Sequence, residues 1–188
     1  SSPAAAQRAD RSSPEALAIY QDAANFQNNK AYELASREWA KFLKQFPDDP
    51  LTAKAGHYEG VCHVQLQQHE RAIAALEKVV ATYPKFELIE DTYLNLGWSQ
   101  YTLARQGQDG MYGKATNSFA ALLERFPQGK YADQALFFQG EAHYALNKRN
   151  QAVAAYGKLV ENHPESALRA DALYGLGVAL EEMSRAAE

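Results

Sequence analysis

The sequence has a single cysteine and no long apolar run, and both shortages restrict what the chain can be. Cys62 is the only cysteine among 188 residues, so an intramolecular disulfide and a metal cluster built on several thiolates are both excluded. Cys62 lies in the apolar stretch "GVCHV" and is interpreted as a small core residue. No window of about 18 apolar residues occurs, so the sequence predicts no membrane-spanning helix.

Positive charge is also scarce. The chain has 19 Lys and Arg against 23 Asp and Glu, which gives a net charge of −4. Proteins that bind nucleic acid usually present a basic face, and no run of Lys or Arg stands out, so nucleic acid is not expected as a partner. The composition of 46% apolar and 22% charged residues is typical of an ordinary globular protein.

Motifs for catalysis and for cofactors are missing as well. The sequence has no nucleophile motif, phosphate-binding loop or dinucleotide fingerprint. His57, His63 and His69 are six residues apart, a spacing that scatters side chains around a helix, whereas a helical metal pair needs a spacing of three or four. His63 and His143 are interpreted as packed, hydrogen-bonded core residues. The sequence therefore predicts no enzyme activity, no cofactor and no metal site.

What the sequence does contain is a repeat. An alanine, a large apolar residue four positions later and a proline twelve positions after the alanine occur together four times. The copies are Ala35–Trp39–Pro47, Ala72–Leu76–Pro84, Ala115–Phe119–Pro127 and Ala152–Tyr156–Pro164. Successive prolines are 37, 43 and 37 residues apart, and a glycine follows each of them by thirteen residues. Such a period indicates a repeat architecture.

Each repeat is interpreted as a first helix (helix A), a short turn and a second helix (helix B). In "ERAIAALEKVVATYP" the apolar residues recur on one helix face, and the final proline cannot continue the helix. The glycines Gly60, Gly97, Gly140 and Gly177 each lie inside a stretch with a helical pattern. Glycine inside a helix costs about 1 kcal/mol relative to alanine, so a packing reason is expected. The predicted partners are the small residues of the next helix, Ala35, Ala72, Ala115 and Ala152.

The combined pattern resembles the tetratricopeptide repeat (TPR). The best matches to its Leu-Gly pair are Leu96–Gly97 and Leu176–Gly177. Segments such as "FPQGKYADQALFFQGEAHYALNKRNQAVAAYGKLVENHPES" look like the repeats of two bacterial envelope families. These are the periplasmic coordinator of the Tol–Pal system and the outer-membrane lipoproteins of the β-barrel assembly machinery.

The resemblance implies both a fold and a class of function. The implied fold is all-α, a right-handed α-solenoid of stacked helix hairpins with about nine helices. The implied function is a non-enzymatic scaffold for a protein or peptide partner, in the periplasm or cell envelope, with the cytoplasm left open. The alternative is a structural or self-associating solenoid segment of a longer protein.

The repeat interval also predicts the domain organisation. Residues 14–188 are expected to form the solenoid, and residues 1–13, which are small and polar, a disordered leader. The predicted units are 14–47, 50–84, 87–127, 130–164 and a fifth helix A at 166–184. The opening residues fit the start of a mature exported chain or of a trimmed chain, and the fifth helix A fits either a natural cap or a continuing repeat.

The A helices of a solenoid line its concave surface, which such proteins use for binding. Residues three before, one after and four after each small helix-A position are expected to face this surface. The predicted groove residues are Tyr20, His57, Leu94, Trp98, Tyr101, Phe137, Glu141, Tyr144 and Tyr174. An aromatic, partly acidic groove suits a peptide or helix with apolar anchors and a basic residue. The alternative is that several of these rings pack between neighbouring A helices.

The third repeat departs from the others by six additional residues between Gly97 and Ala115. They fall in "ARQGQDGMYGK", where three glycines indicate a loop between helix A and helix B. This loop is interpreted as a tolerated insertion, since longer surface loops cost little closure entropy. The alternative is a secondary partner-contacting loop that carries Met111 and Tyr112.

Overall fold

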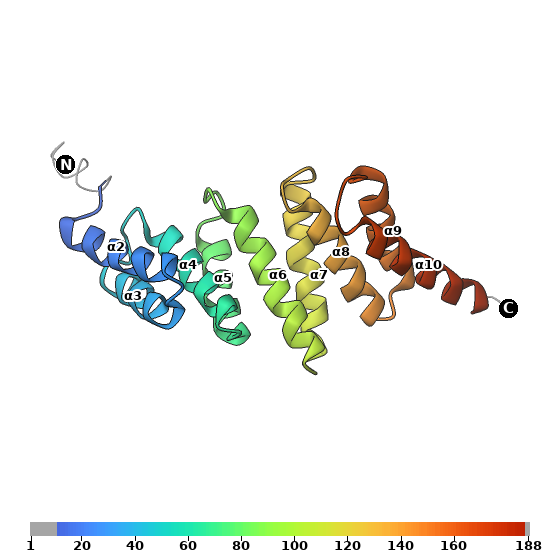
Figure 1. Cartoon of the computed structure of the whole chain (residues 1–188), viewed down its shortest axis with the longest axis horizontal. Helices are drawn as coiled ribbons and strands as arrows, with labels where there is room; N and C mark the ends of the chain where they lie inside the picture. The colour runs from blue at the N-terminus through green and yellow to red at the C-terminus, as the bar shows by residue number, and fades with distance from the viewer. Residues whose placement is uncertain (1–10, 187–188) are drawn as a thin grey trace. The chain divides into compact units, whose positions relative to one another are not determined.

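The computed structural model describes residues 11–186, and these residues form nine α-helices joined by short turns (Figure 1). The helices are α2 (Pro14–Asn28), α3 (Tyr32–Gln45), α4 (Thr52–Gln65), α5 (His69–Thr82), α6 (Ile89–Arg105), α7 (Gly110–Arg125), α8 (Ala132–Ala145), α9 (Arg149–Asn162) and α10 (Arg169–Arg185). The predicted all-α class of about nine helices is confirmed for the described residues.

The predicted disordered leader lies mostly outside the described residues, which begin at Arg11. Its last residues are part of the folded repeat. Ser12 donates a hydrogen bond to Asp49 Oδ1 at 2.6 Å, and Ser13 Oγ caps α2 by accepting from the Ala16 N–H at 3.1 Å. Ser13 is therefore the residue that starts the first helix.

The helices group into two compact units that divide within α6, after Asn95. The first unit contains α2 to α5 and the beginning of α6, and the second contains the rest of α6 and α7 to α10. Inside each unit, helices that follow one another in the chain pack side by side (Figure 1). The A helices are α2, α4, α6, α8 and α10, and the B helices are α3, α5, α7 and α9. The single domain predicted over residues 14–188 stays a prediction.

The prolines end every helix B as predicted. The residues before them are Phe46, Tyr83, Phe126 and His163. Their φ angles lie between −124° and −134°, outside the helical range. This follows because the proline ring crowds the residue before it and disfavours the helical backbone there. One residue signal therefore fixes the end of each repeat.

The core of each repeat consists of the alanine and the large residue four positions after it. The buried pairs are Ala35 and Trp39, Ala72 and Leu76, Ala115 and Phe119, and Ala152 and Tyr156. The predicted contact of the glycines with these alanines needs correction. A Cβ placed on Gly97 would lie 2.6 Å from the Phe119 ring, and one on Gly140 would lie 2.5 Å from the Tyr156 ring. Gly97 and Gly140, like Gly60 beside Leu76, thus make room for the large side chain of helix B.

Of the six additional residues of the third repeat, five lengthen two helices and one lengthens the turn between them, so the predicted long loop is wrong. Helix α6 has 17 residues and α7 has 16, against 14 in each of α4, α5, α8 and α9. Met111 and Tyr112 lie in the first turn of α7. Extending an existing helix adds a backbone hydrogen bond for each residue that is fixed, without a new nucleation step.

The last helix keeps one of its faces uncovered. In α10, Leu173 is 42% and Leu180 is 48% exposed, on either side of Gly177. In the part of the chain that the structure describes, no heavy atom comes within 4 Å of a Cβ placed on Gly177. At the position of α8 equivalent to Leu173, Leu136 is only 4% exposed. The uncovered face of α10 therefore corresponds to the face of the earlier A helices that packs against helix B.

Candidate functional site

The predicted groove residues are distributed over both units. Tyr20, His57 and Leu94 belong to the first unit and the other six to the second. The His57 ring is 4% exposed, and its Nδ1 lies 2.9 Å from Thr92 Oγ1. The Tyr20 ring packs edge-on against Trp39, with centroids 4.9 Å apart. In the first unit His57 is therefore buried, whereas Tyr20 and Leu94 are half-buried.

In the second unit the predicted residues of α6 form an aromatic cluster with α8. The Trp98 ring is 37% exposed and meets Phe138 edge-on, with centroids 4.8 Å apart. The Tyr101 ring is buried, 5.5 Å from Phe138 and 5.9 Å from Tyr112. Phe138 contacts both Trp98 and Tyr101 and so connects the cluster. The prediction missed Phe138 because it named the neighbouring residue of α8, Phe137. Tyr112 is thus tied to the cluster from α7.

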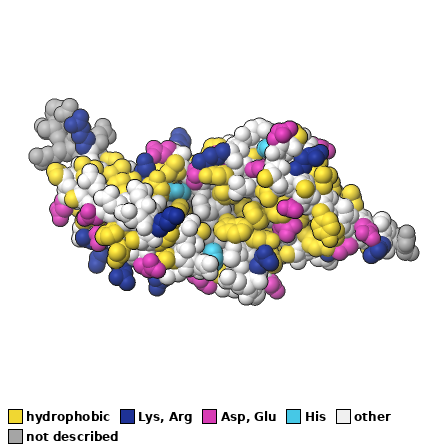
Figure 2. Space-filling model, in the orientation of Figure 1, with side chains coloured by type: hydrophobic (Ala, Val, Ile, Leu, Met, Phe, Trp, Pro, Cys, Tyr) yellow, Lys and Arg dark blue, Asp and Glu magenta, His cyan; other side chains and the backbone are white. Residues whose placement is uncertain are grey.

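A pocket of about 490 Å³ lies in the second unit between α8 and α10. Its lining residues are Phe137, Glu141 and Tyr144 of α8, Tyr156 of α9, and Asp171, Tyr174, Gly175 and Val178 of α10. Four of the predicted groove residues are therefore brought together. Figure 2 shows hydrophobic side chains gathered over the region of α8 and α10, with acidic side chains among them.

Sequence reasoning missed three members of this pocket. Asp171 lies three residues before Tyr174, so the helical spacing of three could have placed it on the same face of α10. Gly175 stands where the earlier repeats carry Tyr58 and Phe138. Tyr156 comes from helix B, and its contribution depends on the packing of α9 against both A helices, which the spacing of the A helices does not reveal.

Glu141 is the central polar residue of the pocket. Its Oε1 accepts a hydrogen bond from Tyr156 Oη at 2.6 Å, and its Oε2 accepts a long one from Tyr101 Oη at 3.4 Å. Burial and the neighbouring Glu141 carboxylate raise the pKa of Tyr101 to about 12. The same two causes and the hydrogen bond raise the pKa of Tyr156. Among residues 11–186, no Lys or Arg lies within ion-pair distance of Glu141.

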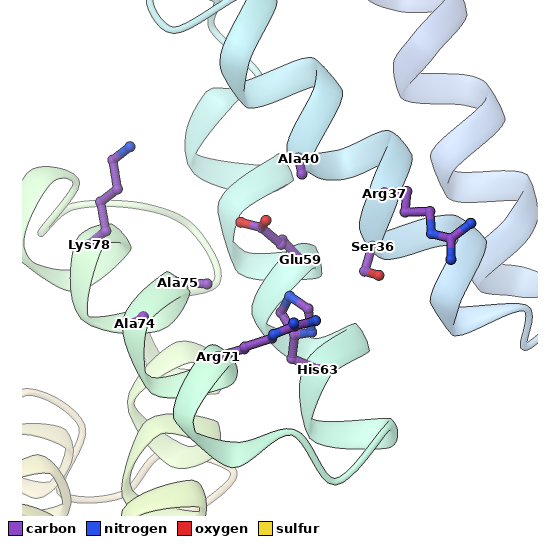
Figure 3. Close-up of a pocket in the computed structure, with 9 residues that line it drawn as sticks. All are labelled: Ser36, Arg37, Ala40, Glu59, His63, Arg71, Ala74, Ala75 and Lys78. Atoms are coloured by element: carbon purple, nitrogen blue, oxygen red, sulfur yellow. The ribbon is translucent and has the colours of Figure 1, made fainter.

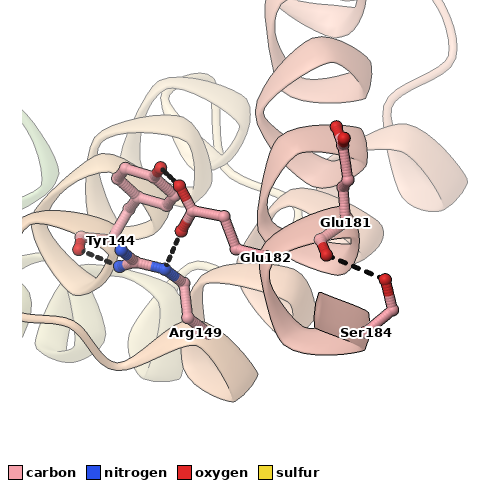
Figure 4. A network of polar contacts seen from close by, with 5 residues as sticks. All are labelled: Tyr144, Arg149, Glu181, Glu182 and Ser184. Carbon is pink, nitrogen blue, oxygen red and sulfur yellow. Dashed lines mark hydrogen bonds and ion pairs between the residues drawn. The ribbon is translucent and has the colours of Figure 1, made fainter. Parts of the chain in front are cut away.

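Next to the pocket, a polar network ties three helices together (Figure 4). The Tyr144 hydroxyl donates to Glu182 Oε1 at 2.5 Å, and Arg149 Nε donates to Glu182 Oε2 at 2.6 Å. The Arg149 guanidinium also lies 3.8 Å from the centroid of the Tyr144 ring. The hydrogen bonds from Tyr144 and Arg149 lower the pKa of Glu182. Tyr144 thus lines the pocket and also binds α10 through Glu182.

A second pocket of about 490 Å³ lies in the first unit, over α4 and between α3 and α5 (Figure 3). Its charged residues are Arg37, Glu59, Arg71 and Lys78, and Ala40, Ala74 and Ala75 supply small walls. An equivalent cleft of about 390 Å³ lies over α8 in the second unit, with Gln139 and Lys158 at the positions of Glu59 and Lys78. Because the cleft recurs, we interpret it as the groove that two consecutive B helices leave above a helix A.

The histidines take part in packing. His63 Nδ1 lies 2.9 Å from Gln68 Oε1, whereas the buried Nδ1 atoms of His69 and His143 have no hydrogen-bond partner within the described ranges. Burial lowers the pKa of all three rings. No three His, Cys, Asp or Glu side chains of residues 11–186 come together as a metal site. Over the same residues, no helix has both the length and the apolar character needed to cross a membrane.

Comparison with known proteins identifies the repeat. Residues 55–85 and 134–166 match the family model described as tetratricopeptide repeat. These segments are tetratricopeptide repeats. The two matches cover the second and fourth predicted units, so the resemblance noted from the sequence is confirmed.

Solved structures share the TPR fold. MamA from Desulfovibrio magneticus RS-1 has a TM-score of 0.69 at 15% identity, over 92% of this chain and 93% of that one. A TPR protein from Parabacteroides merdae ATCC 43184 has a TM-score of 0.75 at 15% identity, over 90% and 62%. YrrB, described as a TPR protein with an unusual peptide-binding site, has a TM-score of 0.68 at 20% identity, over 85% and 74%. The predicted TPR solenoid class is therefore confirmed.

Curated relatives are outer-membrane assembly factors. The chain is 26% identical over 185 residues to BamD of Xylella fastidiosa strain 9a5c. The alignment covers 80% of this chain and 63% of that protein. It is 26% identical over 154 residues to BamD of Caulobacter vibrioides, and this alignment covers 71% of this chain and 50% of that protein. The chain thus spans about half to two thirds of the length of the curated relatives that it matches.

Proposed function

We propose that this chain is a non-enzymatic scaffold that binds a peptide or a segment of a partner protein in the aromatic groove of its second unit. The observation that carries the proposal is the convergence of aromatic side chains of α8 and α10 on one pocket, with Tyr174 77% exposed at its edge. Large aromatic side chains of this kind are enriched among the residues that dominate binding energy. Repeat solenoids generally bind through the surface that their A helices form.

We further propose that the scaffold works in a bacterial cell envelope, on the periplasmic side, within an assembly of proteins. The support is the similarity to BamD, which is by its name an outer membrane protein assembly factor. The similarity covers 80% of this chain in one relative and 71% in the other, and repeats of this type are protein-binding modules. The partner is therefore a protein, and the repeats supply its binding surface.

The experiment that tests this function begins with the intact chain as bait in an envelope fraction. A partner that is captured reproducibly is purified, and its affinity is measured for the chain and for variants. Trp98→Ala and Tyr174→Ala should each weaken binding by at least about 1 kcal/mol while the helical circular-dichroism signal is retained. Trp98→Ala should also lower the melting temperature, because it removes the ring contact with Phe138. Leu34→Ala is the control, because it removes an exposed apolar side chain from the first unit, 45% exposed against 37% for Trp98.

Two outcomes would contradict the groove. The first is that both aromatic substitutions leave affinity unchanged while Met111→Ala or Tyr112→Ala abolishes it. The second is that Leu34→Ala weakens binding as much as Trp98→Ala does. Tyr144→Ala is unsuitable as the main test, because its ring also supports Arg149 and α10.

The alternative function, self-association, is favoured by the uncovered face of α10. Leu173 and Leu180 are exposed on the face that earlier A helices use to hold a helix B. A second copy of the chain would bury these side chains. Sedimentation over a range of concentrations would then reveal a dimer that Leu180→Glu abolishes, and a concentration-independent monomer would exclude this alternative.

A further inference from the structure

We propose that the pocket between α8 and α10 binds an arginine or lysine side chain of the partner peptide. Glu141 and Asp171 would be its anionic contacts, and Phe137 and Tyr174 its aromatic walls. The inference rests on the proposed peptide-binding function and adds the chemistry that the groove selects.

The charge of the lining residues points to a cation. Glu141 and Asp171 are the ionisable acids of the lining, and no Lys or Arg is among the described residues that line it. The Glu141 carboxylate is half-buried and is oriented by the hydroxyl of Tyr156. Each carboxylate oxygen can accept two hydrogen bonds, so Glu141 retains acceptor sites for an ammonium or guanidinium. A charge-assisted bond of this kind is stronger than one between neutral groups.

The aromatic walls favour the same ligand group. Tyr174 is 77% exposed, more than any other large hydrophobic side chain of the described chain. Phe137 faces the same pocket from α8. Aromatic faces attract Lys and Arg side chains through the negative charge of the ring face. A cationic side chain between these rings would cover Tyr174, and Glu141 and Asp171 would balance the charge of the cation.

The chain itself contains a working example of this recognition. The guanidinium of Arg149 lies over the Tyr144 ring and is bound by Glu182 (Figure 4). A carboxylate and an aromatic ring from two helices thus already hold an arginine one turn from Glu141. The proposed ligand would repeat this arrangement with Glu141 and Tyr174.

The pocket exists because of a glycine. In two earlier repeats the residue two positions before the helix-A glycine is an aromatic that covers the large residue of the preceding helix B, whereas the third repeat has Asn95 at this position. Tyr58 stacks on Trp39 with centroids 5.6 Å apart, and Phe138 stacks on Phe119 at 6.2 Å. In α10 this residue is Gly175, whose backbone lies close to Tyr156, because a Cβ placed on it would come 2.9 Å from Tyr156 Cζ. Gly175 therefore carries no ring at this position, and it lines the pocket together with Tyr156. The resulting volume of about 490 Å³ lies within the range of small-ligand sites, about 300–1,000 Å³.

The test uses a phage-displayed library of random dodecapeptides, selected on the intact chain. The enriched peptide is synthesised with its arginine (or with arginine at an enriched lysine) and with citrulline, a neutral side chain of nearly the same shape. Binding of both is measured to the wild-type chain and to Glu141→Gln, which keeps the shape and the acceptor for Tyr156. Glu161→Gln is the matched control, because it removes an exposed charge from α9, outside the pocket.

The expected result is enrichment of one basic residue flanked by apolar ones. Citrulline should weaken binding to the wild-type chain by at least about tenfold. Glu141→Gln should weaken binding of the arginine peptide by a similar factor and remove the difference between the two peptides, while Glu161→Gln should change neither.

Two results would overturn the inference, and they separate it from the proposed function. Enriched peptides that need no basic residue, or that bind equally with citrulline, would mean that the groove binds peptides but does not select a cation. If no peptide is enriched on the wild-type chain above the Trp98→Ala, Tyr174→Ala double variant, the cation pocket and the peptide groove both fail.

Discussion

At the scale of single residues, a glycine inside a helix has opposite consequences at different places in this chain. Gly140 gives room to the Tyr156 ring, whereas Gly177 lies on the uncovered face of α10. Both are in A helices and at the same repeat position, so their helical propensities are comparable. What differs is the neighbour, and that difference can be measured.

Gly140→Ala should therefore lower the free energy of unfolding by about 1–3 kcal/mol, because its Cβ would overlap the Tyr156 ring. Gly177→Ala should raise it by about 0.5–1 kcal/mol, since alanine favours the helix and meets no neighbour. Urea denaturation measures both. Equal stability of the two variants would contradict the packing of α8 against α9.

Glu59 offers a second prediction at this scale. Its burial raises the pKa of the carboxyl group, with a smaller opposing effect of Lys78. When the pKa is higher in the folded state, stability is largest below the unfolded pKa and is lost as pH rises through the folded one. Glu59→Gln should thus raise the denaturation midpoint at pH 7. Glutamine is also the residue at the equivalent position of the fourth repeat, Gln139.

The advantage of Glu59→Gln should shrink as pH falls toward the ordinary glutamate pKa of about 4.3. Glu124→Gln, on the exposed surface of α7, serves as the control. A stabilisation by Glu59→Gln that is the same at pH 4 and at pH 7 would show that charge burial is not its cause.

At the scale of elements, α10 is held by a few polar contacts in addition to its apolar face. Glu182 receives hydrogen bonds from Tyr144 of α8 and Arg149 of α9. The neighbouring Glu181 contacts only residues of its own helix among those described, through its ion pair with Arg185 and its backbone bond to Ser184. The two adjacent acids therefore have different roles.

Glu182→Gln should make α10 open more readily, because it weakens the charge-assisted bonds to Arg149 and Tyr144. Amide hydrogen exchange in α10 should become faster while that of α7 stays unchanged. Glu181→Gln should leave exchange of α10 nearly as in the wild type, since exposed i, i+4 pairs contribute little. Unchanged amide hydrogen exchange of α10 in Glu182→Gln would show that the polar network does not stabilise this helix.

At the scale of the whole molecule, three buried or half-buried histidines link stability to pH. Burial lowers the pKa of His63 and His69 in the first unit and of His143 in the second. A depressed histidine pKa means that the unfolded chain binds protons more readily, so stability rises with pH across the window between the two pKa values. Both units should lose stability on acidification.

The melting temperature should accordingly fall between pH 7.5 and pH 5.5, through the ordinary histidine pKa of about 6.5. A triple variant with glutamine at His63, His69 and His143 should show a smaller fall. Circular dichroism at 222 nm would follow the melting of the helices. A midpoint that is unchanged or higher at pH 5.5 would contradict the assignment of neutral, buried rings.

The sequence by itself determined the repeat, its helix types and its buried alanines. These features follow from signals within about one repeat: apolar residues on one helix face, a proline that ends helix B, and a recurring alanine. The burial of Ala72 and Ala152 and the ends of α5 and α9 were predictable for this reason. Backbone chemistry sets the helix ends locally, and the apolar face of each helix is buried by the neighbouring helix of the same repeat pattern.

Only the tertiary structure decided which side chains meet and which stay open. The Tyr101 hydroxyl reaches Glu141 across 40 residues, and Tyr144 reaches Glu182 across 38. The spacing of one helix face could not show that Gly140 and Gly175 both lie against the Tyr156 ring, or that Gly175 and Tyr156 line the same pocket. Such contacts depend on how the large residues of three helices share one volume, and close packing settles that only when all three are present.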